Sequence, residues 1–270
     1  MDIATKYDTL ANFESRFSQQ NKTYAVHKRL MFKTDDTNDG IKDINDWLAK
    51  NFPLKDNDIL LDAGCGTGKT IFTYAKLCPM IGFGISLSKN EVALAKEAAR
   101  QLDVSNRCSF EVRSYDEPFN QLFDQIIAIE SLKHSKNLQI SLNNLIASLK
   151  YGGQLIIVED MRKGILPNNY FRNLLLKHWS LIDLYSVEDY IVSENTLGIS
   201  QIQEVDFTHL VKFRRTWWSF TLVYVFHLIK MLTLFSTTRK IISIFQAGFA
   251  LEYYYGKRLM KYKVLVFKKV

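Results

Sequence analysis

A chain of 270 residues with 47% hydrophobic and 23% charged residues has an ordinary globular composition, sufficient for one large domain or two small ones. This composition excludes intrinsic disorder, collagen and a coiled-coil array. The three cysteines, Cys65, Cys78 and Cys108, show no metal-ligand spacing and argue against a disulfide framework. The N-terminal residues contain several acids and no apolar run, unlike a secretory or transit peptide. We therefore expect a cytoplasmic protein.

The first predicted elements are two helices, at residues 5–17 and 43–51, with a polar turn at residues 34–40 between them. We expect residues 1–56 to form a helical N-terminal cap.

From Asp58 onward, short apolar runs alternate with longer amphipathic stretches, which indicates a parallel sheet with crossover helices. The predicted strands are residues 59–63, 80–85, 109–113, 125–129 and 155–159. The predicted helices between them are residues 67–77, 89–102 and 138–149. Glycines at 152 and 153 read as the turn that closes the last of these helices.

Two further strands are predicted near the C-terminus, at residues 201–207 and 262–268. More than fifty residues separate them, too many for a structureless connection, so we expect helices there. The predicted organisation is a core at residues 57–207, a basic aromatic helical insert at 208–260, and the last strand of the core at 261–270.

Positive charge is concentrated in that last region. Residues 208–270 hold twelve Lys and Arg residues against one acid, Glu252, whereas the first 207 residues hold 23 basic and 27 acidic residues. An acidic body is thus followed by a basic, aromatic-rich segment that needs its own explanation.

A buried strand runs into a glycine-rich turn at residues 60–68, LLDAGCGTG, and then into a helix. One interpretation is a loose phosphate loop built on Ala63, Gly68, Lys69 and Thr70, which would make the chain an NTP-binding protein. The Asp62 carboxylate opposes it, because it would lie where polyphosphate charge must be held. The other interpretation is the pattern D-x-G-x-G-x-G, in which backbone must approach a ligand closely.

Three more segments follow strand ends in the same order along the chain. They are GISLSKNE at residues 84–91, SYD at 114–116 and ESLKH at 130–134. Together with the glycine turn, they resemble class I S-adenosylmethionine-dependent methyltransferases, and in particular the small-molecule branch that includes tocopherol, sterol and cyclopropane-fatty-acid methyltransferases. The resemblance covers roughly residues 24–268 and includes the E-S-x-x-H signature of that branch.

The resemblance implies a Rossmann-like α/β fold, with a seven-stranded mixed sheet whose last strand is antiparallel, and S-adenosyl-L-methionine as the cofactor. The cofactor-binding residues that it implies are Asp62, Gly64, Cys65, Gly66, Gly68, Ser86, Leu87, Glu91, Ser114, Tyr115, Asp116 and Ile129. Ser86 and Glu91 jointly take the ribose contact, although Glu91 is equally well a solvated acid in the first turn of a helix. The adenine contact is left open between Ser114 and Asp116.

The candidate catalytic residues are Glu130, His134, His209 and Tyr24. Glu130 at a strand end can take a proton or stabilise a cation, and His134 is its partner or an alternative base. The alternative for His134 is that it caps the following helix. His209 is a second candidate base, and Tyr24, with His27, can close the pocket. No metal-ligand constellation is evident, so we expect a metal-independent reaction.

Residues 216–235 are nearly continuous apolar sequence, but His227 and Lys230 near the middle make a membrane-spanning helix improbable. We prefer a lid over the acceptor site. The rings expected to line its apolar pocket are Trp217, Trp218, Phe220, Tyr224 and Phe226. The alternatives are an amphipathic helix on an anionic membrane and an oligomer contact.

Four basic residues flank this segment, Arg214, Arg215, Arg239 and Lys240, and they can receive an anionic handle or an acyl carrier protein. No nucleic-acid partner is expected, because the catalytic signature of nucleobase methyltransferases is absent at residues 129–134.

The expected function is methylation of a small apolar or aromatic metabolite, at carbon in a biosynthetic pathway, with O- or N-methylation as the alternative. A degenerate fold that binds the cofactor only to support a partner is a further possibility.

Overall fold

The computed structural model describes Asp8, Leu30, Met31, and residues 43–191 and 198–270. Its strands are β1 (Ile59–Ala63), β2 (Ile81–Ser86), β3 (Cys108–Val112), β4 (Phe123–Ile129), β5 (Leu149–Arg162), β6 (Ile199–Asp206) and β7 (Met260–Lys269). The predicted strands are confirmed within a few residues, apart from β5, which is much longer than expected. The predicted first helix and the turn after it lie outside the described residues.

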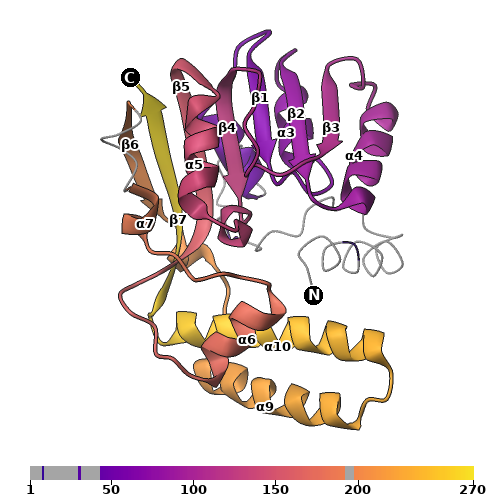
Figure 1. Ribbon diagram of the computed structural model, residues 1–270, viewed down its shortest axis with the longest axis vertical. Coiled ribbons are helices and arrows are strands. Elements are labelled where there is room, and N and C mark those ends of the chain that lie inside the picture. The colour runs from indigo at the N-terminus through magenta and orange to yellow at the C-terminus, as the bar shows by residue number, and fades with distance from the viewer. Residues whose placement is uncertain (1–7, 9–29, 32–42, 192–197) are drawn as a thin grey trace, which may run out of the picture.

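One sheet contains all seven strands, in the order β3-β2-β1-β4-β5-β7-β6. β7 pairs antiparallel with both β5 and β6, whereas β1 to β5 pair parallel with one another. In this register Asp62 of β1 lies between Gly84 of β2 and Ile127 of β4, at the centre of the sheet. The expected mixed sheet with an antiparallel last strand is confirmed. Because these strands are parallel, the carboxyl ends of β1, β2, β3 and β4 lie at the same end of the sheet (Figure 1).

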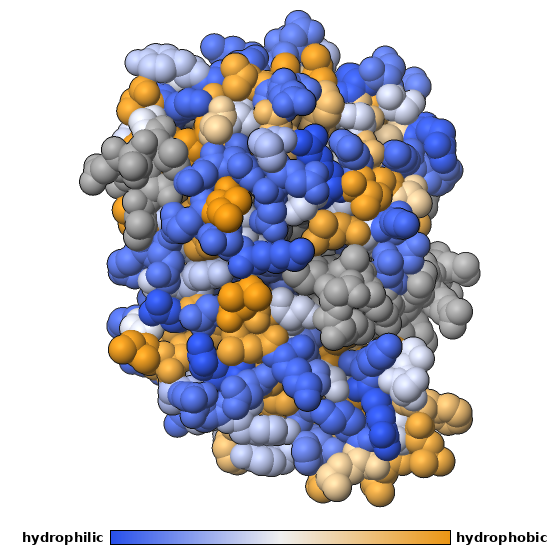
Figure 2. All heavy atoms as spheres, viewed as in Figure 1, coloured by the Kyte–Doolittle hydropathy of each residue, from blue (hydrophilic) through white to orange (hydrophobic). Residues whose placement is uncertain are grey.

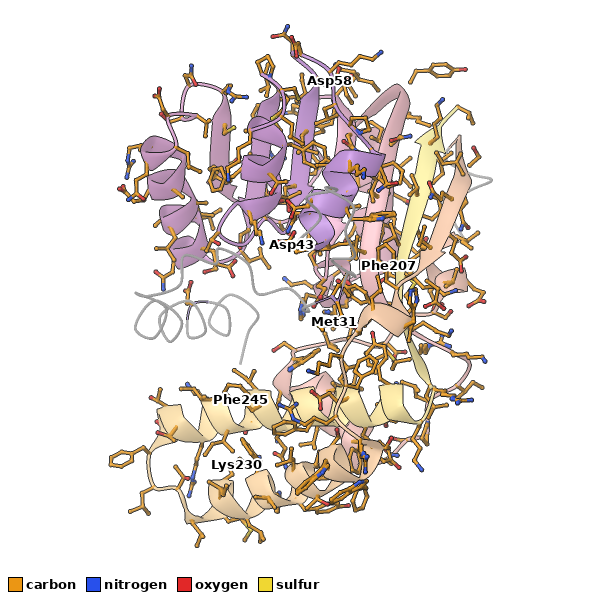
Figure 3. All side chains as sticks on the ribbon, turned by 180° about the vertical axis from the view of Figure 1, so that it is seen from behind. Met31, Asp43, Asp58, Phe207, Lys230 and Phe245 are labelled. Atoms are coloured by element: carbon orange, nitrogen blue, oxygen red, sulfur yellow. The ribbon has the colours of Figure 1, made fainter. Side chains whose placement is uncertain are left out.

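Helices cover both faces of the sheet. They are α2 (Ile44–Asn51), α3 (Lys69–Ala75), α4 (Lys89–Gln101), α5 (Leu138–Ala147), α6 (Tyr170–His178), α7 (Val187–Ile191), α9 (Thr216–Leu232) and α10 (Ser236–Gly256), with the 3-10 helices η1 (Leu132–His134) and η2 (Thr208–Leu210). Buried side chains of α2, α3 and α4 form one core cluster, and those of α5 form a second cluster with the opposite side of the strands. The view from behind in Figure 3 shows Asp43 at the start of α2, on the face away from α5.

The length of β5 corrects the sequence prediction. Helix α5 ends at Ala147, and the two glycines lie inside the strand instead of closing the helix. Gly152 has φ +78°, and the pairing with β4 shifts register between Phe123 and Gln125, so the glycines accommodate a bulge. A Cβ at Gly153 would lie 2.9 Å from a backbone carbonyl oxygen. A bulge and a turn require the same residue type, and the sequence alone did not separate them.

β5 and β7 continue together beyond the end of β4. β4 pairs with β5 only as far as Val158, while the β5–β7 pairing continues to Arg162 opposite Met260. This two-stranded extension leads to the helices α6, α9 and α10, which lie below the edge of the sheet in Figure 1. The last residues of β5 therefore lie between the sheet and these helices.

The segment at residues 208–260 contains η2 and a hairpin of two helices, α9 and α10. α10 packs against α9, α6 and β7, and it lies between α9 and the sheet (Figure 1). Only Ser219 and Val223 of α9 are buried. Among the described residues, no helix is both long and apolar enough to cross a membrane.

Candidate active site

The glycine turn after β1 is held against the end of β4. Gly64 has φ +98°, and a Cβ at this position would lie 2.4 Å from Cβ of Ser131. The hydroxyl of Ser131 donates a hydrogen bond to the carbonyl of Ala63 at 2.6 Å. Gly64 is therefore required for both its left-handed backbone and its close approach to the next strand end. The role of Ser131 in this contact was not predicted from the sequence.

The middle of the turn faces open space. Gly66 has φ +51°, and no atom of the described residues lies within 4 Å of the place where its Cβ would be. Gly68, with φ +91°, is the residue before α3. A left-handed, glycine-rich turn with free space beside it at a helix N-terminus suits a ligand that approaches the backbone.

Asp62 lies beneath this turn and is fully buried. Its Oδ2 has no hydrogen-bond partner among the described residues. Burial raises the pKa of this carboxyl to about 7, opposed by a hydrogen bond from Thr70. An acid held at the boundary of ionisation is stabilised by a nearby cation, and S-adenosyl-L-methionine carries a sulfonium and an amino group. The residues of the turn thus fit this cofactor.

Cys65 is buried behind the turn, with its Sγ 2.9 Å from where a Cβ on Gly84 would lie. Burial, reinforced by the nearby Asp62 and Glu91 carboxylates, raises the pKa of the thiol well above its usual value. The side chain therefore packs as a small apolar group, and Cys65 can offer a ligand only its backbone.

The structure brings Ser86 and Glu91 together at the end of β2, as the resemblance implies. The hydroxyl of Ser86 donates to Oε2 of Glu91 at 2.6 Å, and both side chains are buried. Glu91 is therefore not a solvated acid, which removes that alternative. Leu87 lies between them in the chain and is partly exposed. Their ribose contact stays a prediction.

Asp8 reaches the same place from the N-terminal region. Its Oδ1 accepts hydrogen bonds from the Ser88 hydroxyl and, at 3.3 Å, from the backbone N–H of Asn90. The carboxylate thus adds to the N-terminus of α4, where an acid is favoured. No local signal in the sequence indicates a contact across eighty residues.

The residues after β3 contact the end of β4 and the start of α5. The hydroxyl of Tyr115 donates to the carbonyl of Ser131 at 2.7 Å. Asp116 accepts hydrogen bonds from the hydroxyls of Ser135 and Ser141, and its own N–H donates to Ser114 Oγ at 3.0 Å. Asp116 therefore ties the end of β3 to η1 and α5, and the adenine contact remains a prediction for Ser114 or Asp116.

Glu130 directly follows β4 and the buried Ile129, and it has a left-handed backbone with φ +50°. Its N–H donates to the carbonyl of Val158 at 2.8 Å, which anchors the backbone to β5. A non-glycine residue in this conformation is strained, and such residues concentrate at functional sites.

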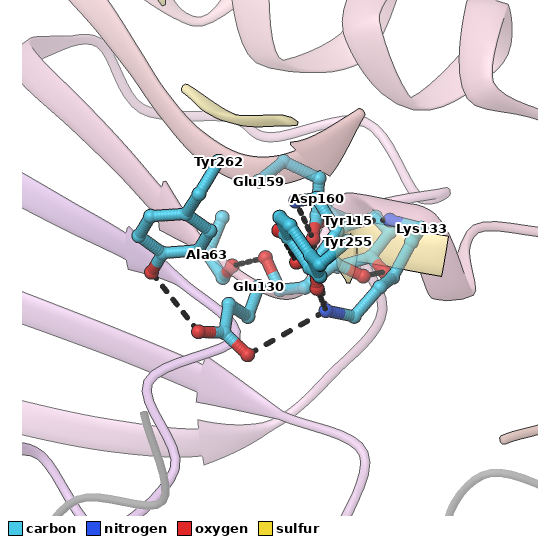
Figure 4. A network of polar contacts seen from close by, with 9 residues as sticks. Ala63, Tyr115, Glu130, Lys133, Glu159, Asp160, Tyr255 and Tyr262 are labelled. Atoms are coloured by element: carbon cyan, nitrogen blue, oxygen red, sulfur yellow. Dashed lines mark hydrogen bonds and ion pairs between the residues drawn. The ribbon is translucent and has the colours of Figure 1, made fainter. Parts of the chain in front are cut away.

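A buried lysine holds a cluster of three carboxylates beside this point, which we call the Lys133 network (Figure 4). The Nζ of Lys133 lies 2.9 Å from Glu159 Oε1, 3.1 Å from Asp160 Oδ2 and 3.6 Å from Glu130 Oε2. Burial raises the pKa of Glu159, and the neighbouring Asp160 and Glu130 add to this against the attraction of Lys133. Among the described residues, one ammonium thus lies within 3.6 Å of three carboxyl groups.

Two tyrosines complete the Lys133 network from the C-terminal part of the chain. The hydroxyl of Tyr262, in β7, donates to Glu130 Oε1 at 2.9 Å. The hydroxyl of Tyr255, in α10, donates to Asp160 Oδ1. Burial and the adjacent carboxylates raise the pKa of both phenols, so both remain donors. Lys133, Asp160, Tyr255 and Tyr262 were not predicted from the sequence, because no local pattern marks a buried charge whose partners are distant.

His134 is buried in η1, one residue after Lys133. The alternative that it caps the following helix is wrong, because Asn137 is the N-cap of α5 and accepts from Gln139 and Ile140. The structure therefore places His134 in the same turn as the network, and its catalytic role stays a prediction.

His209 lies apart from this group. It is exposed in η2, after β6, at the edge of the sheet that is farthest from β3. The neighbouring Asp206 pairs with Lys261 at 2.7 Å, and Thr208 accepts from the Tyr262 N–H at 3.0 Å. These contacts join β6 to β7 and do not bring His209 to Glu130. Tyr24 and His27 lie outside the described residues.

Lys69 and Thr70, which a phosphate loop would use, are engaged elsewhere. Lys69 forms an ion pair with Asp43 at the start of α2, and Thr70 donates to Asn45 Oδ1 at 2.9 Å. Both therefore fasten α2 onto α3. Within the described part of the chain, no three His, Cys, Asp or Glu side chains form a group that could hold a metal ion.

The aromatic rings of α9 do not line a pocket against the sheet, contrary to the expectation. Trp217 and Trp218 stack on each other at 4.2 Å and are exposed, while Phe220 and Tyr224 pack on Phe171 of α6. The reason is the order of the layers, since α10 separates α9 from the sheet. A lid function stays a prediction for the hairpin, with α10 as its inner surface.

One curated relative is 27-O-demethylrifamycin SV methyltransferase of Amycolatopsis mediterranei, which is 34% identical over 42% of this chain and 43% of its own length. Another is sterol 4-C-methyltransferase strm-1 of Caenorhabditis elegans, which is 27% identical over 47% of this chain and 39% of its own length. The chain thus spans about two-fifths of the length of these relatives. The cyclopropane synthase MmaA2 of Mycobacterium tuberculosis has a similar structure, with a TM-score of 0.73, 17% identity, and coverage of 99% of this chain and 97% of its own.

A family model described as a methyltransferase domain matches residues 54–188, half of the chain. The matched part contains the glycine turn, the Ser86–Glu91 pair and the whole Lys133 network except its two tyrosines. The chain belongs to the methyltransferase-domain family.

Proposed function

We propose that this protein is an S-adenosyl-L-methionine-dependent methyltransferase that acts on a small, largely apolar metabolite and transfers the methyl group to carbon. The observation that carries the proposal is the placement of Glu130. Its strained backbone, Tyr262 and Lys133 hold its carboxylate beside the glycine turn that fits the cofactor. The cofactor, when bound, supplies a methyl group on a sulfonium.

On this proposal, the glycine turn and the Ser86–Glu91 pair bind the cofactor, and Asp62 faces its positive charge from below. Ser131 connects the cofactor-binding turn to Glu130. Its hydroxyl donates to the turn, and Glu130 is the residue directly before it in the chain. Methyl transfer is a displacement, so fixing donor and acceptor at attack distance is the main task. A turn fastened directly to the strand end that carries Glu130 suits that task.

The charge of the Lys133 network favours carbon as the acceptor atom. An alkene that receives a methyl cation becomes positively charged before it loses a proton. The described part of the network brings three carboxyl groups together in a largely buried setting, where carboxylates stabilise such a cation. Glu130 is partly exposed, so its carboxylate can also accept the departing proton.

The relatives support the coarser part of this proposal. Their printed names include a sterol 4-C-methyltransferase and a methyltransferase of a demethylrifamycin. One name indicates transfer to carbon and the other to oxygen, so the names leave the acceptor atom open. The carboxyl groups of the Lys133 network favour carbon. O- or N-methylation is the alternative that the first experiments must separate.

Cofactor binding is tested first by titration calorimetry with S-adenosyl-L-homocysteine and, separately, with Mg-ATP. We expect binding of S-adenosyl-L-homocysteine and no heat with Mg-ATP, because Lys69 and Thr70 are engaged with α2. The Gly66→Val variant is expected to abolish binding, since its side chain would occupy the open side of the turn. Binding of Mg-ATP alone would overturn the proposal.

The acceptor is then sought by screening apolar alkenes, phenols and amines with donor carrying a labelled methyl group. For a carbon acceptor, Glu130→Gln is expected to lower kcat by roughly 10²- to 10⁴-fold while leaving S-adenosyl-L-homocysteine affinity unchanged. Glu117→Gln, at an exposed acid, is the matched control and should leave turnover unchanged. Intact turnover in Glu130→Gln, or label found only on oxygen or nitrogen, would contradict C-methylation.

A further inference from the structure

The outer face of α9 is apolar along its whole length. Its exposed residues are Trp217, Trp218, Phe220, Thr221, Tyr224, Val225, Leu228, Ile229, Met231 and Leu232, and none of them is charged. A helix of this length extends over about 25 Å. Since soluble proteins rarely leave so long an apolar surface open, this face calls for a partner.

The turn between α9 and α10 continues that surface. Leu232, Leu234 and Phe235 are 83%, 89% and 76% exposed, as much as side chains in an unfolded segment. Figure 2 shows hydrophobic residues gathered at this end of the hairpin, at the lower right, next to hydrophilic ones. The apolar face therefore ends in a protruding apolar tip.

A basic pocket opens beside the tip. It has a volume of about 530 Å³ and is lined by Lys177, His178, Lys230, Met231, Arg239, Lys240, Ser243 and Ile244, with no carboxylate among them. Lys230 lies between α9 and α10, as Figure 3 shows, and its Nζ is 3.5 Å from Gln246 Oε1.

Burial and neighbouring positive charge both act on the basic groups of this pocket. Burial, and then repulsion from Lys177, lowers the pKa of Lys230. Burial lowers the pKa of His178 to about 4, with Lys230 and Lys177 adding to the effect. An anion of phosphate type would relieve this repulsion.

Positive charge also borders the other end of α9. Arg214 and Arg215 precede the helix, and Glu252, the sole acid in residues 208–270 of the sequence, pairs with Arg214. A second copy of the chain would bring this basic surface against itself, which like-charge repulsion disfavours. An apolar face between basic ends is complementary to a lipid surface with anionic headgroups.

We propose that α9 and the α9–α10 turn dock on an anionic phospholipid bilayer, with the apolar face among the acyl chains and a lipid phosphate in the basic pocket. This docking is independent of the methyl-transfer proposal. It would also place the Lys133 network above the bilayer, because the hairpin projects from the edge of the sheet where that network lies.

The test is co-sedimentation of the full chain with vesicles of phosphatidylcholine alone and of phosphatidylcholine mixed with phosphatidylglycerol. We expect binding to the anionic vesicles, weak binding to the neutral ones and loss of binding at high salt. Leu228→Ser combined with Leu232→Ser should weaken binding roughly tenfold or more, and Lys240→Glu about tenfold.

Matched controls come from the far end of α3. Leu77 is 67% exposed, close to Leu228 at 60%, and Lys76 is exposed as Lys240 is, so Leu77→Ser and Lys76→Glu should bind like the unaltered chain. Equal binding to both vesicle types, or hairpin variants that bind like these controls, would overturn the proposal. So would a dimer in analytical ultracentrifugation that Leu228→Ser with Leu232→Ser converts to a monomer. S-adenosyl-L-homocysteine binding, measured in parallel, separates this result from failure of the proposed function.

Discussion

The Lys133 network and the basic pocket of the hairpin are both clusters of charged side chains, but their charges are compensated in different ways. In the network, one buried ammonium lies within 3.6 Å of three carboxyl groups, and two tyrosines donate to them. In the pocket, five ionisable basic side chains gather without an acid among the lining residues. The first cluster is compensated inside the fold, whereas the second is compensated only by solvent or by an external partner.

The difference separates internal geometry from recognition. A buried charge must be paired, because its transfer out of water is otherwise costly, so the network fixes the positions of β4, β5, β7 and α10 relative to one another. Exposed like charges cost little in water, so the pocket can remain open until an anion enters. Variants at matched residues should therefore lower the free energy of unfolding much more in the network than in the pocket.

The largest effect is expected for Lys133→Met. Removal of the ammonium takes an ion-pair partner from the buried Glu159 and Asp160, which should lower the free energy of unfolding by about 3–5 kcal/mol. Lys230→Met, in the pocket, should change it by less than about 0.5 kcal/mol. Urea denaturation measures both, and equal losses in the two variants would remove the distinction.

Asp62 provides a buried charge that awaits a partner, and its effect depends on pH. Its pKa of about 7 in the folded protein exceeds the usual 3.8, so the folded state holds the proton more tightly and stability falls as pH rises from about 4 to 7. Asp62→Asn should remove a loss on the order of 4 kcal/mol across that window.

Thermal unfolding of both proteins between pH 4 and 8, without ligand, checks this expectation. Glu117→Gln, at an exposed acid, should follow the unaltered chain. Parallel curves for Asp62→Asn and the unaltered chain would mean that Asp62 ionises freely beneath the glycine turn.

A smaller effect is expected for the tyrosine hydroxyls. Tyr255→Phe removes a donor to the buried Asp160 and should lower the free energy of unfolding by about 1.5–3 kcal/mol. Tyr170→Phe, in α6, removes a hydroxyl that pairs with His227 at 2.8 Å and accepts from Gln246 at 3.0 Å. Both contacts are between neutral groups and Gln246 keeps its bond to the Val223 carbonyl, so about 0.5–1.5 kcal/mol is expected. Chemical denaturation that ranks these two variants in the reverse order would argue against a compensated network.

The smallest effect concerns His178, whose pKa of about 4 results first from burial and then from Lys230 and Lys177. Lys230→Met should raise the pKa of His178 while leaving most of the burial effect in place. Histidine NMR signals followed from pH 3 to 8 measure the change. An unchanged pKa would show that the charges of the pocket do not act on one another.

The sequence was a good guide to the sheet and to the glycine turn, because both depend on neighbouring residues. Alternation of apolar runs predicts five of the strands, and Gly64, Ser86 and Glu91 lie where their motifs indicate. It was a poor guide to β5, where Gly152 serves a bulge instead of a turn. It also assigned the aromatic rings of α9 to a pocket that α10 keeps them away from.

The sequence by itself therefore determined the family, the order of most elements and the position of the glycine turn, since these rest on local spacing and on periodic hydrophobicity. Only the tertiary structure decided that Lys133 is the centre of a buried network, because Tyr255 and Tyr262, which donate to the carboxylates around it, are more than a hundred residues away from it in the chain. It also decided which face of α9 remains open. Burial and charge compensation depend on distances in space, and a linear pattern does not contain them.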